Sequence, residues 1–156
     1  MNQLRQFEEF LADGIAKKQR PDPSRSRYLS QEADKRYKFL NDLNDKIGAT
    51  DDNANYFVET AYDIIMELIR AIMHLEGVSA SGAHAHEAEV AYLRKIGISE
   101  PEVRYANELR YFRNGINYYG RILDKEYAQN VLLFLEQIRP ALIGSIQRLQ
   151  TNKRTK

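Results

Sequence analysis

Proline and glycine are scarce in this chain, and nearly all of them stand between stretches with helical periodicity. The 156 residues include four prolines and eight glycines, and no window alternates apolar and polar residues as a half-buried strand does. At 43% apolar, the chain suits one domain that buries a core of its own. We therefore expect an all-α fold.

The apolar spacing and its stop signals predict a series of helices over 1–16, 31–47, 52–76, 87–96, 100–119 and 124–150. The third of these is the longest apolar one and should be central, because one line of it is apolar throughout: Phe57, Ala61, Ile64, Leu68, Ile72 and Leu75. Ser99 and Glu102 form a capping box that opens the fifth helix, and Pro101 lies in its first turn, where its missing N–H costs nothing. In the last helix, Pro140 should produce a kink or divide it in two.

This reading divides the chain into three parts. Residues 1–30 form an N-terminal helix and a basic Pro/Ser linker, 31–150 form the helical bundle, and 151–156 form a disordered tail. The linker over 17–28, "KKQRPDPSRSRY", sets five cations against a single Asp. It is either a solvated tether or a segment that touches phosphate.

Composition excludes several classes of site. Without cysteine there is no disulfide, thiolate zinc site, iron–sulfur cluster or thiol nucleophile. No run approaches the roughly 20 apolar residues of a bilayer span, and the first residues lack a signal-peptide core. We therefore expect a soluble cytoplasmic protein without a membrane partner. The net charge of +1 gives no global attraction to nucleic acid, so any such affinity must come from a local patch.

Such a patch is predicted on the helix over 100–119. One side of this helix is apolar, whereas the other carries cations and amides within an arc of roughly 100°. We call this set the arginine/amide ridge, and its members are Arg110, Arg113, Asn114, Asn117 and Arg121. Tyr111 and Tyr118 flank it. Guanidinium groups beside neutral donors suit a phosphate-containing ligand. The alternative is a solvated face, or arginines paired with acids of the third helix such as Asp63 and Glu67.

The stretch "FRNGINYYG" resembles the signature of the HEPN domain family, in which Arg and a polar residue precede a His by four to six positions near a helix end. The helix "YFVETAYDIIMELIRAIMHLEG" also looks like the long central helix of these domains. The resemblance covers roughly 53–149. It implies an up-and-down bundle of four or five helices, commonly a homodimer whose motif helices face each other. Many members are metal-independent RNA endonucleases, often toxins paired with nucleotidyltransferase antitoxins, and others bind RNA or nucleotides or act as scaffolds.

Carried over by position, the resemblance makes Arg113, Asn114 and Tyr118 the candidate catalytic residues, with Tyr118 at the histidine position. Tyrosine, with a reference pKa near 10, is ionised about one part in a thousand at pH 7, so as a base it starts about three orders of magnitude behind histidine. An acidic role, a phosphate contact or base stacking suits it better. The tyrosine that some toxin members have modified corresponds to Gly120 here.

The function expected is RNA or nucleotide binding in a degenerate ribonuclease-type cleft, as part of a toxin–antitoxin or nucleotidyltransferase system. The alternatives are a metal-independent RNA endonuclease and a noncatalytic scaffold for a protein partner. Arg110, Asn117, Arg121 and Tyr111 are the candidate binding residues, and Glu67 is a possible neighbour of the site. We expect no cofactor and no metal, and we interpret the "HAHE" segment as a mobile polar loop. The chain's three histidines lie outside the motif helix, so the usual base is missing unless the fold brings one back.

Overall fold

The chain folds as a mostly helical structure. The computed structural model describes residues 2–120 and 122–154, with the backbone alone for 117–119, 153 and 154. Two strands and a 3₁₀ turn accompany the helices, in the order α1 (Phe7–Ala12), β1 (Ala16–Lys18), α2 (Pro23–Lys46), α3 (Ala54–Glu76), β2 (Val78–Ala80), α4 (Ala85–Tyr92), η1 (Leu93–Ile96), α5 (Glu100–Tyr119) and α6 (Lys125–Arg154). The predicted helical class is confirmed. No helix within the described ranges combines the length and apolarity that crossing a membrane requires.

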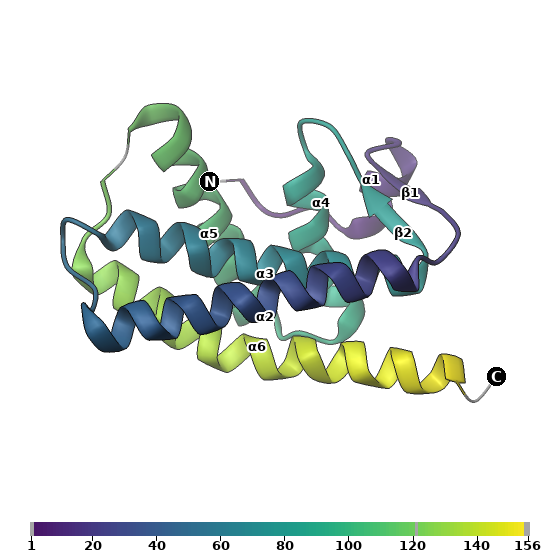
Figure 1. The fold of residues 1–156 in the computed structure, drawn as a ribbon. Helices are drawn as coiled ribbons and strands as arrows, with labels where there is room; N and C mark the ends of the chain where they lie inside the picture. Colours follow the sequence, from purple (N-terminus) through teal and green to yellow (C-terminus); the bar gives the residue numbers. More distant parts are fainter. Residues whose placement is uncertain (1, 121, 155–156) are drawn as a thin grey trace.

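Helix α3 is the centre of the molecule, as its sequence predicted. Figure 1 shows α2 and α6 running along α3, while α4 and α5 cross it. The whole predicted apolar line of α3 is buried: Phe57, Ala61, Ile64, Leu68, Ile72 and Leu75. Because neighbours cover this helix on several sides, its polar residues are also drawn toward the interior.

The N-terminal segment differs from the predicted helix over 1–16. Helix α1 covers only Phe7–Ala12, and Gly14, with a φ of 74°, turns the chain into strand β1. β1 pairs antiparallel with β2, Ala16 opposite Ala80 and Lys18 opposite Val78. Strands of three residues are too short to show alternation in a sequence, so both were missed.

Helix α2 begins at Pro23 rather than after Ser30, so the prediction of an extended linker through 28 is wrong. Asp22 is the N-cap, and its Oδ1 accepts a hydrogen bond from the Arg25 N–H at 2.9 Å. Pro23 at the first helical position has the φ that a helix needs, and its missing N–H is not required there. One of the two prolines that suggested a linker, Pro23, is therefore the first residue of a helix.

The second half of the chain follows its signals closely. Ser99 and Glu102 form the predicted capping box at the start of α5, and Ser99 Oγ donates to Glu102 Oε2 at 2.7 Å. Helix α6 contains Pro140 and is not divided by it. It also continues to Arg154, so residues 151–154 of the predicted disordered tail are helical; residues 155 and 156 lie outside the described part.

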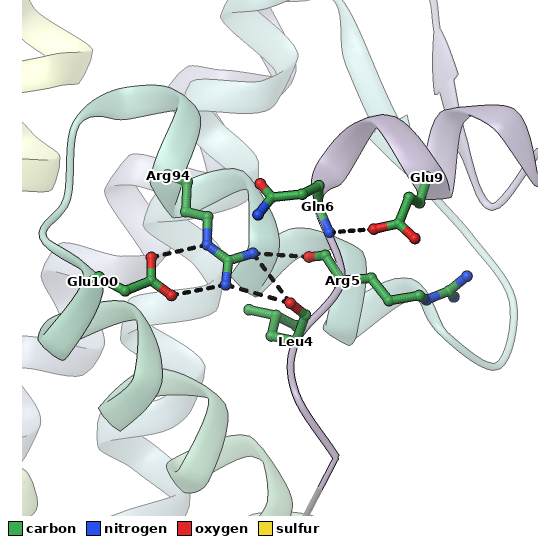
Figure 2. A network of polar contacts seen from close by, with 6 residues as sticks. All are labelled: Leu4, Arg5, Gln6, Glu9, Arg94 and Glu100. Atoms are coloured by element: carbon green, nitrogen blue, oxygen red, sulfur yellow. Dashed lines mark hydrogen bonds and ion pairs between the residues drawn. The ribbon is translucent and has the colours of Figure 1, made fainter.

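Arg94 of η1 ties the N-terminal segment to the start of α5. Its guanidinium donates to both carboxylate oxygens of Glu100, at 3.0 and 2.9 Å, and to the Arg5 carbonyl at 2.9 Å. Figure 2 shows these contacts together with the longer ones to the Leu4 carbonyl. One side chain thus joins three segments and fixes α5, the helix that carries the ridge.

A candidate phosphate-binding cleft between α4 and α5

Part of the arginine/amide ridge lines a cleft against the loop that leads into α4. The cavity has a volume of about 270 Å³. We call it the Arg/His cleft, and it is lined by Gly82, Ala83, His84, His86, Glu87, Arg110, Arg113 and Asn114. Two elements far apart in the sequence therefore supply two guanidinium groups, one amide and two imidazoles to a single concave site.

Arg113 lies against α3. Its Nη2 atom is 3.9 Å from Asp63 Oδ1, and its Cζ atom lies 5.4 Å from the centre of the Tyr62 ring. Its Nε atom is buried and has no hydrogen-bond partner within the described part of the chain. The sequence left open that the ridge arginines pair with acids of the third helix. Arg113 does lie near such an acid, Asp63, but the distance is at the upper limit for an ion pair and too long for a hydrogen bond.

Arg110 is oriented by a residue of its own helix. Its Nε atom donates to Oδ1 of Asn107 at 3.0 Å, and Asn107 is buried. This bond, made three residues earlier on α5, holds the stem of Arg110 and leaves its forked end at the cleft, which its side chain lines. The spacing of Arg110, Arg113 and Asn114 at three and four residues places all of them on one helix face.

A buried polar network lies beneath the cleft. Arg70 of α3 donates from Nε and Nη2 to the two carboxylate oxygens of Glu89, at 2.9 and 3.0 Å. Its Nη2 atom also lies 3.1 Å from Nε2 of His86, whose Nδ1 atom is 3.0 Å from the Tyr62 hydroxyl. Because arginine only donates, Nε2 of His86 accepts and Nδ1 carries the hydrogen that is donated to Tyr62.

The electrostatics of this network keep His86 neutral. Burial, followed by the charges of Arg70, Arg113 and Arg110, lowers the pKa of His86 below its ordinary value. Burial also raises the pKa of Tyr62 well above its usual range, and that of the Glu89 carboxyl above its ordinary value. His86 and Tyr62 are therefore uncharged hydrogen-bonding groups at neutral pH, and they fix the wall of the cleft without adding charge.

His84 is arranged differently from His86. Its Nδ1 atom is 3.2 Å from Oε2 of Glu87, one turn later on α4, and its side chain is 60% exposed. His84 is the residue just before the helix, and Gly82, with a φ of 85°, precedes it in the loop. The rim of the cleft thus carries a solvent-accessible imidazole held by a carboxylate.

The other candidate residues do not join the cleft or lie outside the description. Tyr111 is 48% exposed and contacts the ring of Phe112, its neighbour on α5. Glu67 is nearly buried, pairs with Arg36 of α2 and is absent from the residues that line the cleft. The side chains of Asn117 and Tyr118, and all of Arg121, lie outside the described residues.

The histidines are the functional candidates that the sequence prediction did not place at the site. The prediction of a mobile polar loop at "HAHE" is wrong for most of the segment, because Ala85, His86 and Glu87 form the start of α4 and only His84 precedes the helix. Within 2–120 and 122–154, no group of three or more acidic or histidine side chains is arranged to hold a metal ion. The sequence signal was His-x-His itself, but the contact with α5 depends on how α4 crosses the core.

Comparisons with known proteins do not identify the chain. No protein-family model, curated protein or solved structure gives a match. The likeness of "FRNGINYYG" to the HEPN signature therefore stays a prediction, and the argument for function depends on the geometry of the site.

Proposed function

We propose that this protein binds RNA or a nucleotide through phosphate groups in the Arg/His cleft. The observation that carries the proposal is the convergence of Arg110, Arg113 and Asn114 with two histidines in one cavity. Guanidinium forks bind phosphate oxygens in pairs, and the side-chain amide of Asn114 adds a neutral hydrogen-bond donor. Glu87 is the one carboxylate among the lining residues.

A comparison within the molecule supports the proposal that Arg113 is available to a ligand. Arg70 makes two hydrogen bonds of 2.9 and 3.0 Å to Glu89, so its charge is satisfied internally. Within the described part of the chain, the ion-pair partner of Arg113 is Asp63 at 3.9 Å, and that carboxylate is itself 39% exposed. A phosphate in the cleft would offer closer oxygen atoms than Asp63 does, and charge-assisted hydrogen bonds of this kind contribute about 1.5–3 kcal/mol each.

The dimensions of the cleft favour part of a chain rather than a whole small molecule. Its volume of about 270 Å³ lies just below the roughly 300–1,000 Å³ of typical small-molecule sites. One phosphate and part of its nucleotide fit inside, while flanking nucleotides would lie on the surface around it. Single-stranded RNA meets this description, and the exposed ring of Tyr111, next to Arg110 in the sequence of α5, offers a stacking surface.

The resemblance to HEPN domains extends the proposal to an up-and-down bundle that dimerises with the α5 helices facing each other. In that arrangement two Arg/His clefts would lie near one two-fold axis. A toxin–antitoxin setting with a nucleotidyltransferase partner belongs to the same extension. Its support is the sequence motif, whereas the support for phosphate binding is the cleft.

Fluorescence anisotropy of a labelled single-stranded RNA of about 12 nucleotides tests the proposal. We expect the parent protein to bind, and the double variant Arg110→Ala/Arg113→Ala to bind at least about tenfold more weakly, because each lost charge-assisted contact is worth about 1.5–3 kcal/mol. Arg104→Ala is the control for loss of a guanidinium charge, since it removes one arginine from an exposed position of the same helix, outside the cleft. Circular dichroism melting confirms that each variant is folded.

The salt dependence gives a second measurement. Each phosphate contact on a single strand contributes about 0.7 to the slope of log affinity against log salt concentration, so the double variant should lose at least one such unit and Arg104→Ala none. Equal RNA affinity in the parent and the double variant would exclude the cleft as the site. Competition by a mononucleotide that matches competition by RNA would identify the nucleotide as the ligand.

A second candidate is metal-independent RNA cleavage, which the resemblance to HEPN domains assigns to Arg113, Asn114 and Tyr118. The observation in its favour is that histidines from another element line the cleft that contains Arg113 and Asn114. Histidine takes up and releases protons near neutral pH far more readily than tyrosine. Under this second candidate, a histidine outside α5 performs the proton transfer for which a tyrosine at the motif position is poorly suited.

A further inference from the structure

The two histidines of the Arg/His cleft have different hydrogen-bond states, and the difference assigns them different tasks. Both nitrogens of His86 are engaged, Nε2 by Arg70 at 3.1 Å and Nδ1 by Tyr62 at 3.0 Å. Arg70 is in turn held by Glu89 on the other side. A proton could reach His86 only by displacing a guanidinium, so His86 serves as a fixed part of the wall.

His84 has one nitrogen engaged and one available. A carboxylate only accepts hydrogen bonds, so the contact of 3.2 Å to Glu87 Oε2 requires the hydrogen on Nδ1 of His84. In the neutral ring, Nε2 then carries a lone pair, and no hydrogen-bond partner of Nε2 lies within the described part of the chain. An imidazole whose tautomer is set by a carboxylate is the arrangement that general-base catalysis needs.

We propose that His84 is the proton acceptor for cleavage of bound RNA at the Arg/His cleft, and that Glu87 is its positioning residue. The proposal rests on the proposed phosphate binding by Arg110 and Arg113. The proposed base lies just before α4, whereas the sequence motif places its candidate residues on α5. The reacting group is the ribose 2′-hydroxyl beside a phosphodiester, because the cleft supplies a base and cations but the substrate supplies the nucleophile.

The step balances as an internal displacement. Nε2 of His84 takes the proton from the 2′-hydroxyl, and the 2′-oxygen forms a bond to phosphorus. The bond from phosphorus to the 5′-oxygen breaks, and that oxygen leaves with the electron pair and takes a proton from water. The hydroxide so formed removes the proton from His84. The products are a 2′,3′-cyclic phosphate end and a 5′-hydroxyl end.

The contribution of each group follows from where charge develops. Negative charge gathers on the phosphate oxygens during the displacement, and the guanidinium groups of Arg110 and Arg113 lie in the same cavity to stabilise it. Glu87 holds the ring of His84 in the reactive tautomer and stabilises the imidazolium that forms. The side chain of Glu87 is 21% exposed and that of His84 is 60% exposed, so water screens this pair and its effect should be smaller than in a buried dyad.

The test measures cleavage of a labelled RNA of about 12 nucleotides by the purified full chain in EDTA. The parent should produce 2′,3′-cyclic phosphate ends, and an otherwise identical 2′-O-methyl RNA should bind without being cut. His84→Ala should lower kcat by about 100-fold or more, the usual contribution of a positioned base, while RNA affinity stays within about twofold of the parent. His84→Gln, which keeps a hydrogen-bonding side chain at this exposed position, should lose kcat in the same way.

Two further readouts separate a chemical role from a structural one. Added imidazole should restore part of the activity of His84→Ala and none of that of Arg113→Ala, because it replaces a base and not a cation. Glu87→Gln should lower kcat by about tenfold with KM unchanged, since the amide still fits but no longer fixes the tautomer. His74→Gln is the matched control: His74 bonds Gln19 at 3.2 Å, outside the residues that line the cleft, and its loss should leave kcat unchanged.

The outcomes distinguish the two proposals. RNA binding that depends on Arg110 and Arg113 without cleavage by the parent would overturn the role of His84 and leave the proposed function standing. Cleavage by His84→Ala at the parent rate would also overturn it. Absence of RNA binding by the parent would overturn both.

Discussion

The ion pair beneath the cleft gives the sharpest test of the structure. Arg70→Met removes the two donors that Glu89 receives at 2.9 and 3.0 Å and leaves that carboxylate, 6% exposed, in an apolar setting. Breaking a buried pair in this way costs about 3–5 kcal/mol when both partners are enclosed. Because the side chain of Arg70 is 31% exposed, water reaches the site, and we expect a loss of about 2–4 kcal/mol in the free energy of unfolding.

Urea unfolding followed by circular dichroism at pH 7 measures this loss. The matched control is Arg5→Met, which removes an arginine from Asp13 at 2.7 Å in a pair whose side chains are 34% and 55% exposed. Exposed pairs contribute about 0–1 kcal/mol, so this variant should remain close to the parent. The double variant Arg70→Met/Glu89→Met should recover most of the lost stability, since no buried charge is left alone.

The pH dependence provides the check on mechanism. Burial already raises the pKa of Glu89, and removal of the guanidinium should raise it further. A carboxyl whose pKa is higher in the folded state than in the unfolded state destabilises the fold as pH rises from the unfolded value, near 4.3, through the folded value. The deficit of Arg70→Met should therefore shrink between pH 7 and pH 5. A loss below about 1 kcal/mol, or one that does not change with pH, would refute the reasoning.

Two other predictions concern the backbone and the second cleft histidine. Gly77→Ala should lower the free energy of unfolding by more than the roughly 1–2 kcal/mol that a left-handed φ alone costs, because a Cβ there would lie 2.6 Å from the Gln19 carbonyl oxygen. Gly82→Ala is the control: its φ is 85° and no atom lies within 4 Å of the added Cβ, so it has only the cost of the left-handed φ. Thermal melts in which both variants lose the same stability would contradict the close approach. Burial lowers the pKa of folded His86, so the unfolded state takes up a proton first as pH falls below about 6.5, and stability falls with it. His86→Gln lacks this proton uptake, and its melting temperature should therefore fall less than that of the parent between pH 7.5 and pH 5; parallel curves would argue against a buried neutral His86.

Local signals in the sequence predicted most of the helices. The apolar line of α3 and the capping box at Ser99 are both local patterns, and both are found in the structure. The errors occurred where a local signal had two meanings. Pro23 and Ser30 each fit a helix start, and the choice depended on whether Asp22 formed a cap. The short strands β1 and β2 pair with each other across the length of α2 and α3, so neither is visible from its own residues.

Only the part of the candidate site that depends on local spacing was predicted from the sequence. Arg110, Arg113 and Asn114 share a face because helical spacing places them there, and this requires no knowledge of the rest of the fold. The sequence predicted a polar loop for the histidine segment, and no local rule says that this segment lies beside α5. Glu67 was predicted as a neighbour of the site but does not line the cleft. Its side chain pairs with Arg36 of α2, a contact that the sequence alone does not reveal.

The sequence by itself determined the helical class, the central position of α3 and the arginine/amide face of α5, since each depends on periodicity within one segment. The tertiary structure decided what that face meets. The crossing of α4 over α3 brings His84 and His86 to Arg113. The bond from Arg70 engages His86, whereas Nε2 of His84 has no partner among the described residues. The physical reason is that a catalytic or binding site depends on distances between side chains remote in sequence, and only the packing of the core fixes those distances.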